Sequence, residues 1–183
     1  MNYTLKELIS IHENKKVVLD LIKQGKYIKI SHGIYSDEEP ELSELEYIFL
    51  RYPNATLTLQ SAVAYYDLSD YVPNKYHIST PLNAHKIHLS KVEQTFMRNE
   101  MCDIGRIRIE TNNGYIYIYD KERLLIEIFR LQKKLPYDYV KEVINSYRLL
   151  AKEEAISFRK IVKYCEMITY GKSIRNRIKE VVL

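Results

Sequence analysis

The sequence predicts an α+β fold, because two antiparallel β-hairpins lie among short helices and the last third of the chain is helical. The first hairpin turns at residues 31–33 and the second at residues 112–114, and each turn contains a glycine that can adopt positive φ. Stretches of helical periodicity then follow residue 136 up to the end of the sequence. Strand pairs followed by a run of helices are typical of this fold class.

Composition limits the class of protein. The chain has 183 residues, of which 46% are hydrophobic, so we expect one core domain with a small appendage. No apolar run approaches the roughly 18–20 residues that span a bilayer, and no leader sequence is evident, which predicts a cytoplasmic protein without a membrane partner. Cys102 and Cys165 have no Cys or His neighbour at metal-ligand spacing, so we expect both thiols to be reduced.

The charges are unevenly distributed. Although the net charge is only +4, residues 1–36 carry six lysines against three acids, whereas residues 37–46 carry six acids and no base. This asymmetry predicts a basic unit at residues 1–36 that faces a polyanion, joined to a core domain at residues 37–183. A surface that is neutral on average is the alternative.

Two short helices are predicted at the amino terminus. Thr4 and Glu7 form a capping box, and Asn14 is a suitable N-cap for a second helix that ends near Gln24, before Gly25. The predicted buried face of the second helix comprises Val17, Val18, Leu21 and Ile22. The hairpin of residues 26–35 follows directly.

Helix, turn, helix and hairpin in this order favour a winged helix-turn-helix unit, in which the second helix enters the major groove and the hairpin contacts phosphates. The unit is shortened, because only three residues precede Thr4 and the usual leading helix is missing. The candidate DNA-binding residues are Lys15, Lys16, Lys23, Lys26, Lys29 and His32. Asp20 lies on the same face as Lys16 and would repel phosphate, so a hairpin that packs on the core or serves as a protein interface is the alternative.

The middle of the chain begins with a short helix in the second half of the acidic segment, which ends near Tyr52. A second helix, capped by Thr56 or Thr58, then turns at Pro73 into a strand at residues 75–80. Its buried stripe has helical spacing and comprises Leu59, Ala62, Val63 and Tyr66.

Four more strands are predicted, at residues 85–89, 92–97, 106–110 and 115–119. The last of these reads Y-I-Y-I-Y, so three tyrosines share one face of the strand. These tyrosines form either a contact surface or the outer face of a half-buried sheet.

Asp120 is expected to cap the next helix, whose apolar face comprises Leu124, Leu125, Ile128 and Phe129. Arg123, Glu127, Arg130 and Lys134 lie together on the other side. Arg123, Glu127 and Arg130 form either an ion-pair ladder worth a few tenths of a kcal/mol per pair or a set of anchors for a protein partner. Asp138 and Ser173 are the predicted caps of later helices, and Gly171 is a predicted helix stop.

Catalytic signatures are absent from the sequence. Gly171-Lys172-Ser173 ends like a phosphate-binding loop but lacks the upstream glycine, and His85 and His88 have no third metal ligand at a suitable spacing. A nuclease of the restriction type would place a lysine two residues after a strand glutamate, whereas Glu110 is followed by Thr111 and Asn112. We therefore expect a binding protein with no catalytic residue, no metal and no cofactor.

Three motifs resemble the AbiEi family. They are G-K-Y-I-K-I-S-H-G-I-Y in the hairpin, L-x-S-A-x-x-Y-Y-x-L-S-D-Y-V-P-N with H-I-S-T-P in the middle, and Y-D-K-E-R at the start of the later helix. The positions that carry the resemblance in the core are Ser61, Tyr66, Asp70, Tyr71, Pro73, Asp120, Arg123, Glu127 and Arg130. Glu127 departs from the family pattern, in which an aspartate is expected.

The resemblance implies an antitoxin and transcriptional regulator of a type IV toxin–antitoxin system, acting in phage defence by abortive infection. Its expected partners are a nucleotidyltransferase toxin, which it counteracts with or without direct contact, and operator DNA, through which it regulates its own operon. A stand-alone DNA-binding regulator is the alternative, and a metal-dependent nuclease is a third interpretation.

Overall fold

The computed structural model describes residues 1–31, 33–38, 42–112 and 114–182. It is a mixed α and β structure with two β-sheets, which confirms the predicted α+β class. Contacts divide the chain into two units, one comprising residues 1–53 with 109–116 and the other comprising residues 54–108 with 117–183. The domain boundary expected after residue 36 stays a prediction.

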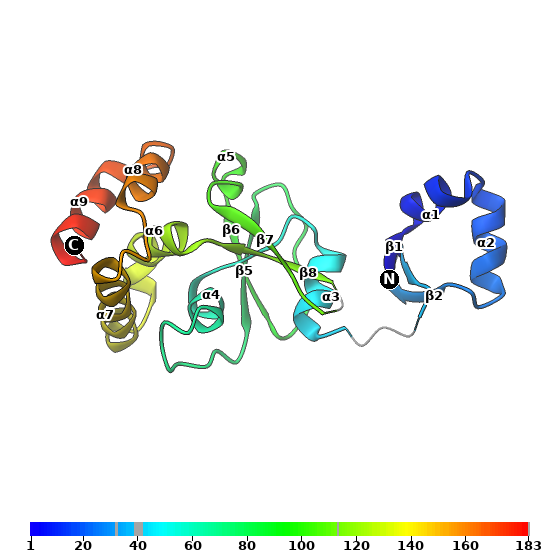
Figure 1. Cartoon of the computed structure of the whole chain (residues 1–183), viewed down its shortest axis with the longest axis horizontal. Helices are drawn as coiled ribbons and strands as arrows, with labels where there is room; N and C mark the ends of the chain where they lie inside the picture. The colour runs from blue at the N-terminus through cyan, green and yellow to red at the C-terminus, as the bar shows by residue number, and fades with distance from the viewer. Residues whose placement is uncertain (32, 39–41, 113, 183) are drawn as a thin grey trace. The chain divides into compact units, whose positions relative to one another are not determined.

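The first unit begins with two helices that pack on a small sheet (Figure 1). Its elements are β1 (Asn2–Thr4), α1 (Leu5–His12), α2 (Lys15–Lys23), β2 (Ile28–Ser31) and β3 (Ile34–Ser36). The sheet has the order β1-β3-β2, with both pairs antiparallel. The sequence did not predict β1, because three residues are too few to display a period of two.

The predicted ends of these helices are confirmed. The Thr4 hydroxyl accepts from the Glu7 amide at 3.2 Å, and the Glu7 carboxylate accepts from the Thr4 amide at 2.6 Å. Asn14 Oδ1 accepts from the Lys16 amide at 2.9 Å, and Gly25 adopts a φ of 77° after α2. These contacts satisfy backbone groups that a short helix otherwise leaves without partners.

The core of this small unit is built from Leu8, Val18, Tyr27 and Tyr35. Val17 was predicted to be buried with them, but its side chain is 44% exposed and the prediction is wrong. With a single three-stranded sheet to pack against, α2 buries only a narrow stripe, and Val17 lies beside that stripe.

A further helix of the first unit, α3 (Glu44–Arg51), begins in the second half of the acidic segment, as predicted. Ser43 is its N-cap, and the buried Glu46 carboxylate accepts from both the amide and the hydroxyl of Ser43 at 2.8 Å. Glu46 also accepts from the hydroxyl of Thr111, which connects α3 to the tip of the second hairpin.

The second sheet has five strands in the order β6-β5-β4-β8-β7. Their bounds are β4 (Thr56–Leu57), β5 (Tyr76–Pro81), β6 (Val92–Met97), β7 (Arg106–Glu110) and β8 (Tyr115–Tyr119). β4 pairs antiparallel with β5 and parallel with β8, and β5 pairs parallel with β6. Buried residues of β4, β5 and β8, including Leu57, Ile78 and Ile118, form the centre of this core.

The strand predicted at residues 85–89 is wrong, because these residues form a loop. The side chain of Gln94 in β6 takes the place of a neighbouring strand there: its Oε1 accepts from the Ile87 amide at 2.8 Å and its Nε2 donates to the His85 carbonyl at 3.2 Å. A glutamine side chain therefore satisfies backbone groups that we expected a strand ladder to satisfy.

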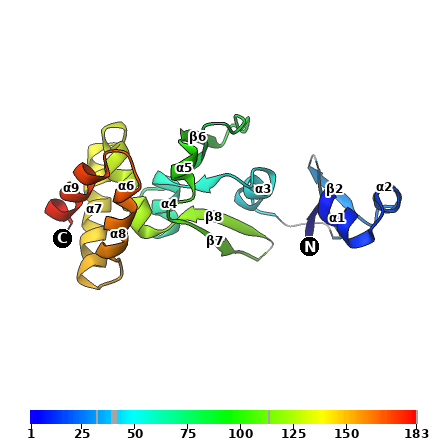
Figure 2. The same cartoon turned by 90° about the horizontal axis from the view of Figure 1, so that it is seen from above.

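Helices pack on the sheet and form the carboxyl-terminal end of the second unit (Figures 1 and 2). They are α4 (Leu59–Tyr65), α5 (Asn99–Cys102), α6 (Lys121–Leu131), the 3₁₀ turn η1 (Gln132–Lys134), α7 (Tyr137–Lys152), α8 (Phe158–Glu166) and α9 (Gly171–Val181). α6 contacts α4, α8 and α9, so it lies at the centre of this part of the fold. None of the helices in the described part of the chain has the length and apolar character to cross a membrane.

Three predicted helix signals were misplaced. Asp138 lies in the first turn of α7, whose N-cap is Pro136, and Ser173 lies inside α9. Gly171 does not stop a helix but begins α9 after Tyr170, which has a φ of 63°. A Cβ on Gly171 would lie 1.8 Å from the Cys165 carbonyl oxygen, so glycine is required here for close packing against the end of α8.

Candidate functional site

The candidate DNA-binding lysines are all exposed on the first unit. Lys15, Lys16 and Lys23 lie on α2, whereas Lys26 and Lys29 lie before and within β2; His32 lies outside the described residues. The exposed face of α2 has the spacing i, i+3, i+4, i+7 and comprises Lys16, Leu19, Asp20 and Lys23. One face of α2 therefore presents two cations, one carboxylate and one aliphatic side chain.

The charges of these lysines are not compensated locally. Within the part of the chain that the structure describes, none of the five lysines forms an ion pair with an acidic side chain. Asp37 is engaged by the amino terminus and by the Tyr3 hydroxyl, and these contacts hold the pKa of its carboxyl below its usual range despite some desolvation. The lysine ammonium groups are thus available to an anionic ligand.

Ser61 and Tyr66, two positions that carry the AbiEi resemblance at α4 and the turn after it, connect α4 to the sheet. The Ser61 hydroxyl accepts from the His77 amide at 2.8 Å and donates to the Lys75 carbonyl at 3.2 Å. The Tyr66 hydroxyl donates to the Tyr119 carbonyl at 3.0 Å. These contacts connect the turn at both ends, to β5 and to the end of β8.

The remaining residues of this motif lie along the loop between α4 and β5. The amide of Asp70 donates to the Glu142 carboxylate at 2.7 Å, and the Tyr71 ring meets the Tyr139 ring edge-on, with 5.5 Å between the ring centroids. Pro73 is half-buried, whereas Val72 beside it is 84% exposed. The motif therefore holds a loop that presents one large apolar side chain to solvent.

A row of Ser61, His77 and Glu93 next to this turn was not predicted from the sequence. Ser61 Oγ lies 3.4 Å from His77 Nδ1, and His77 Nε2 lies 3.7 Å from Glu93 Oε2. Burial lowers the pKa of His77, so its imidazole is neutral. Because the buried Ser61 hydroxyl already donates to a backbone carbonyl, this row holds α4 and β5 together and does not activate a nucleophile.

The family-motif residues of α6 form a buried charge network. Arg123 has no exposed surface, and its Nη2 lies 2.8 Å from Glu127 Oε1, while the side chain of Glu127 is 1% exposed. Arg130 donates its Nε to Glu127 Oε2 at 3.0 Å, and the Arg123 guanidinium lies 4.9 Å from the centroid of the Tyr119 ring. The predicted ion-pair ladder is present, but we expected it on an outer face and it lies inside the protein.

Burial of the ladder follows from the position of α6, which is covered by α4 on one side and by α8 and α9 on the other. The start of the helix is held in the same way: Asp120 Oδ1 accepts from the Arg123 amide at 2.8 Å, and Oδ2 accepts from the Tyr164 hydroxyl at 2.8 Å and from Lys160 Nζ at 2.9 Å. Asp120, Arg123 and Glu127 are therefore interior supports and are not available as anchors for a partner, whereas Arg130 is half-buried.

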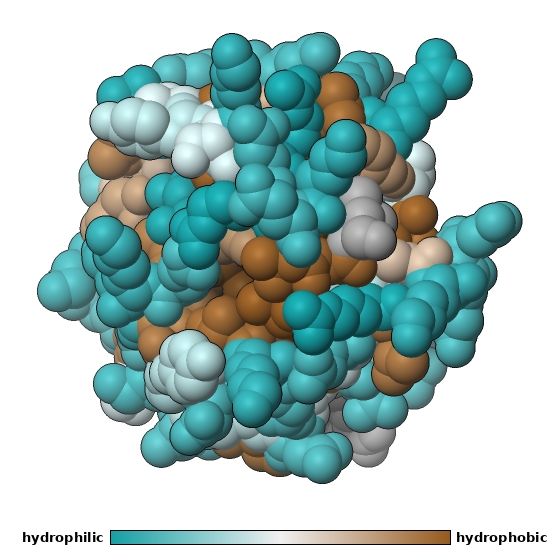
Figure 3. Space-filling model, turned by 90° about the vertical axis from the view of Figure 1, so that its left-hand side faces the viewer, coloured by the Kyte–Doolittle hydropathy of each residue, from teal (hydrophilic) through white to brown (hydrophobic). Residues whose placement is uncertain are grey.

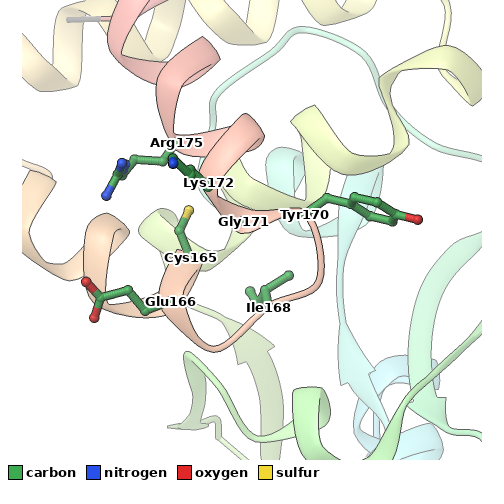
Figure 4. A pocket seen from close by; sticks show the side chains of 7 residues that line it. All are labelled: Cys165, Glu166, Ile168, Tyr170, Gly171, Lys172 and Arg175. Carbon is green, nitrogen blue, oxygen red and sulfur yellow. The ribbon is translucent and has the colours of Figure 1, made fainter.

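A cavity of about 510 Å³ lies where α8 meets α9 (Figure 4). Cys165 lines it together with Lys172 and Arg175, and Figure 4 shows the sulfur pointing toward the side of the cavity where these two cations lie, while the Tyr170 ring points away. Burial raises the pKa of the Cys165 thiol, so the reactive thiolate is disfavoured.

Acidic and histidine side chains do not gather into a metal centre in residues 1–31, 33–38, 42–112 and 114–182, where no group of three or more potential ligands is present. His85 and His88 are exposed in the loop before β6, and Glu110 is exposed at the end of β7. The nuclease interpretation therefore gains no candidate site from the described residues.

No protein-family model matches the chain, and no curated protein matches it with significance. The AbiEi resemblance thus stays a prediction from the three motifs, and the function has to be argued from the geometry of the two units.

Proposed function

We propose that the chain is a DNA-binding antitoxin of the AbiEi type, which represses its own operon and counteracts a nucleotidyltransferase toxin. The observation that carries the proposal is the first unit, in which two capped helices precede an antiparallel hairpin and five exposed lysines lack an acidic partner among the described residues. This combination suits the sequence-independent attraction of the phosphate backbone.

In this proposal the first unit acts as a winged helix-turn-helix. α2 enters the major groove with Lys16 and Lys23 directed toward the DNA, and Lys29 in β2 contacts a phosphate beside the groove. Leu19, on the same face of α2, is placed to contact the methyl group of a thymine. Asp20 opposes binding to phosphate and favours a site at which it faces a base donor, so it adds selectivity at the expense of affinity.

The second unit carries the antitoxin role in this proposal. The motif residues on α6 lie in the interior of this unit, and those in and after α4 connect a loop to the sheet by hydrogen bonds. Both groups stabilise the fold of the unit, and neither forms a catalytic arrangement. An interior scaffold of this kind is suited to presenting a surface to another macromolecule.

Two kinds of charge reversal on α2 test DNA binding, and we expect them to change the affinity for DNA in opposite directions. The double variant Lys16→Glu/Lys23→Glu should weaken binding to a fluorescent duplex from the chain's own promoter region more than tenfold, whereas Asp20→Lys should strengthen non-specific binding. Lys163→Glu, an exposed charge reversal on α8, is the matched control. Fluorescence anisotropy at several salt concentrations measures both affinity and salt slope. Equal affinity of the double variant and the control would refute DNA binding by α2.

The antitoxin role is separated from DNA binding in a growth assay. Cells that produce the nucleotidyltransferase toxin that this proposal expects to be encoded beside this gene should survive when they also produce either the natural chain or Lys16→Glu/Lys23→Glu. If the natural chain binds promoter DNA but gives no protection, the stand-alone regulator is the correct interpretation. If neither activity is found, the proposal fails as a whole.

A further inference from the structure

A groove separates α7 from the carboxyl-terminal end of α9 and from η1, and its volume is about 590 Å³. Figure 3 views the end of the molecule that carries these helices, and it shows a hollow with hydrophobic side chains at its centre and hydrophilic side chains around it. All residues that line the groove belong to the second unit.

The floor and the rim of the groove differ in chemistry. Leu135, Val140, Ile144 and Val181 contribute aliphatic surface, and Tyr137, whose side chain is 80% exposed, adds an aromatic ring. Among the described residues that line the groove, the charged ones are Lys133, Lys141 and Arg148, and none of them carries a carboxylate. This part of the lining thus combines an apolar floor with positive charges.

Two of these cations have no ion-pair partner among the described residues. Lys133 and Lys141 are exposed, and neither forms an ion pair with any residue of the described ranges, which end at residue 182. Arg148 has a different role, because its Nε donates to the Val181 carbonyl at 2.8 Å and its Nη1 donates to Asn145 Oδ1 at 3.1 Å. It connects α7 to the end of α9, so this contact fixes the spacing of the two helices at the groove.

The wall formed by α7 is itself firmly supported. Val143 and Tyr147 are fully buried on the inward side of α7, and the Tyr147 hydroxyl donates to the Lys121 carbonyl at 2.8 Å. Tyr137, Lys141, Ile144 and Arg148 recur at helical spacing along the groove side of the same helix. α7 therefore presents a preformed surface, and little ordering is needed when a ligand binds.

We propose that this groove binds an acidic amphipathic helix of a partner protein. Leucine-like side chains at i, i+3 or i+4, and i+7 would fill the apolar floor, and carboxylates beside them would meet Lys133 and Lys141. A nucleic acid fits less well, because its phosphates need cations but offer nothing for the aliphatic floor. The inference goes beyond the proposed function and does not depend on DNA binding by the first unit.

The test uses synthetic peptides of about 15 residues, a length at which an amphipathic helix begins to be stable. The first peptide carries leucines on one face and glutamates beside them; the second replaces each glutamate by lysine; the third has the composition of the first with the leucines scattered. Binding of each labelled peptide to the full chain is measured by fluorescence anisotropy, together with a labelled single-stranded oligonucleotide. Shifts in amide NMR signals locate the site.

We expect the first peptide to bind at least ten times more tightly than the other two, with shifts confined to η1, α7 and the end of α9. Lys141→Glu should weaken it about tenfold and improve binding of the lysine peptide, and Tyr137→Ala should weaken it several-fold. Both side chains are exposed, so neither variant should change the melting temperature.

Lys163→Glu is again the matched control. Equal loss in Lys141→Glu and in this control would show non-specific charge attraction and overturn the proposal. So would equal binding of the three peptides, or tighter binding of the oligonucleotide through Lys141. Failure here leaves the proposed function untouched, because that function is tested on Lys16 and Lys23.

Discussion

The buried charge network of α6 makes a quantitative prediction for Glu127→Gln. This change keeps the shape of the side chain but removes the only carboxylate that the structure places against Arg123 among the described residues. The Arg123 side chain is completely buried, and its Nε and Nη1 already lack hydrogen-bond partners in that part of the chain. The variant therefore leaves an arginine charge in the interior without compensation.

The expected cost follows from burial. Removing one partner of a buried ion pair typically destabilises a protein by about 3–5 kcal/mol, whereas an exposed pair at i, i+4 contributes only about 0.3–0.5 kcal/mol. The side chains of Arg123 and Glu127 are 0% and 1% exposed, so the larger range applies to Glu127→Gln. Arg130→Met should cost about 1 kcal/mol or less, because the side chain of Arg130 is 26% exposed and Glu127 keeps Arg123.

Urea unfolding followed by circular dichroism measures these free energies. The paired variant Arg123→Met/Glu127→Leu should be more stable than Glu127→Gln, because it removes the buried charges together. The reasoning is refuted if Glu127→Gln lowers the free energy of unfolding by less than about 1 kcal/mol. It is also refuted if the paired variant loses as much stability as Arg123→Met and Glu127→Leu lose separately, added together. Either result would mean that the network behaves like a solvated surface ladder.

Three other predictions concern Gly171, Tyr119 and Tyr66 of the second unit, with Gly25 of the first unit as a comparison. Gly171→Ala should lower the free energy of unfolding by about 1–3 kcal/mol because its Cβ has no room beside α8. Gly25→Ala, which has open space around it but a φ of 77°, should lower it by about 1 kcal/mol. Urea titration compares the two variants. Burial raises the pKa of Tyr119 from 10.0 to about 12, so this tyrosine ionises at a lower pH in the unfolded chain than in the folded one. Its contribution to the free energy of unfolding is complete below pH 10 and should be lost between pH 10 and 12. Melting temperatures across this range should fall less steeply in Tyr119→Phe. Tyr66→Phe removes the hydrogen bond to the Tyr119 carbonyl and should cost about 1 kcal/mol by the same urea assay.

Local signals allowed much of the fold to be predicted. The capping box at Thr4, the N-caps at Asn14 and Asp120, and the strand at residues 92–97 depend on neighbours within a few positions, and the structure confirms them. The errors arose where a contact between a side chain or backbone group and a neighbouring element decides the conformation, which local patterns do not show. Gln94 replaces a strand ladder at residues 85–89, and the end of α8 selects glycine at position 171.

The candidate sites likewise differ in how far local sequence patterns could predict them. Exposed lysines on α2 follow from helical periodicity, so the first unit could be outlined from the sequence. Burial of Arg123 and Glu127 could not, because it requires α8 and α9 to cover a helix face that has a polar sequence. The groove beside α7 was also missed, since it combines the last turn of α9 with residues more than 30 positions earlier.

The strand order of the five-stranded sheet has a practical consequence for handling the protein. β6 and β7 lie at its two edges, where open backbone groups invite pairing with another molecule. β7 carries Arg106, Arg108 and Glu110, whereas β6 has a single charged side chain, Glu93, and a 42% exposed Phe96. We therefore expect β6 to be the edge at which concentrated or partly unfolded samples aggregate, and a lysine in place of Phe96 to improve the yield of soluble protein.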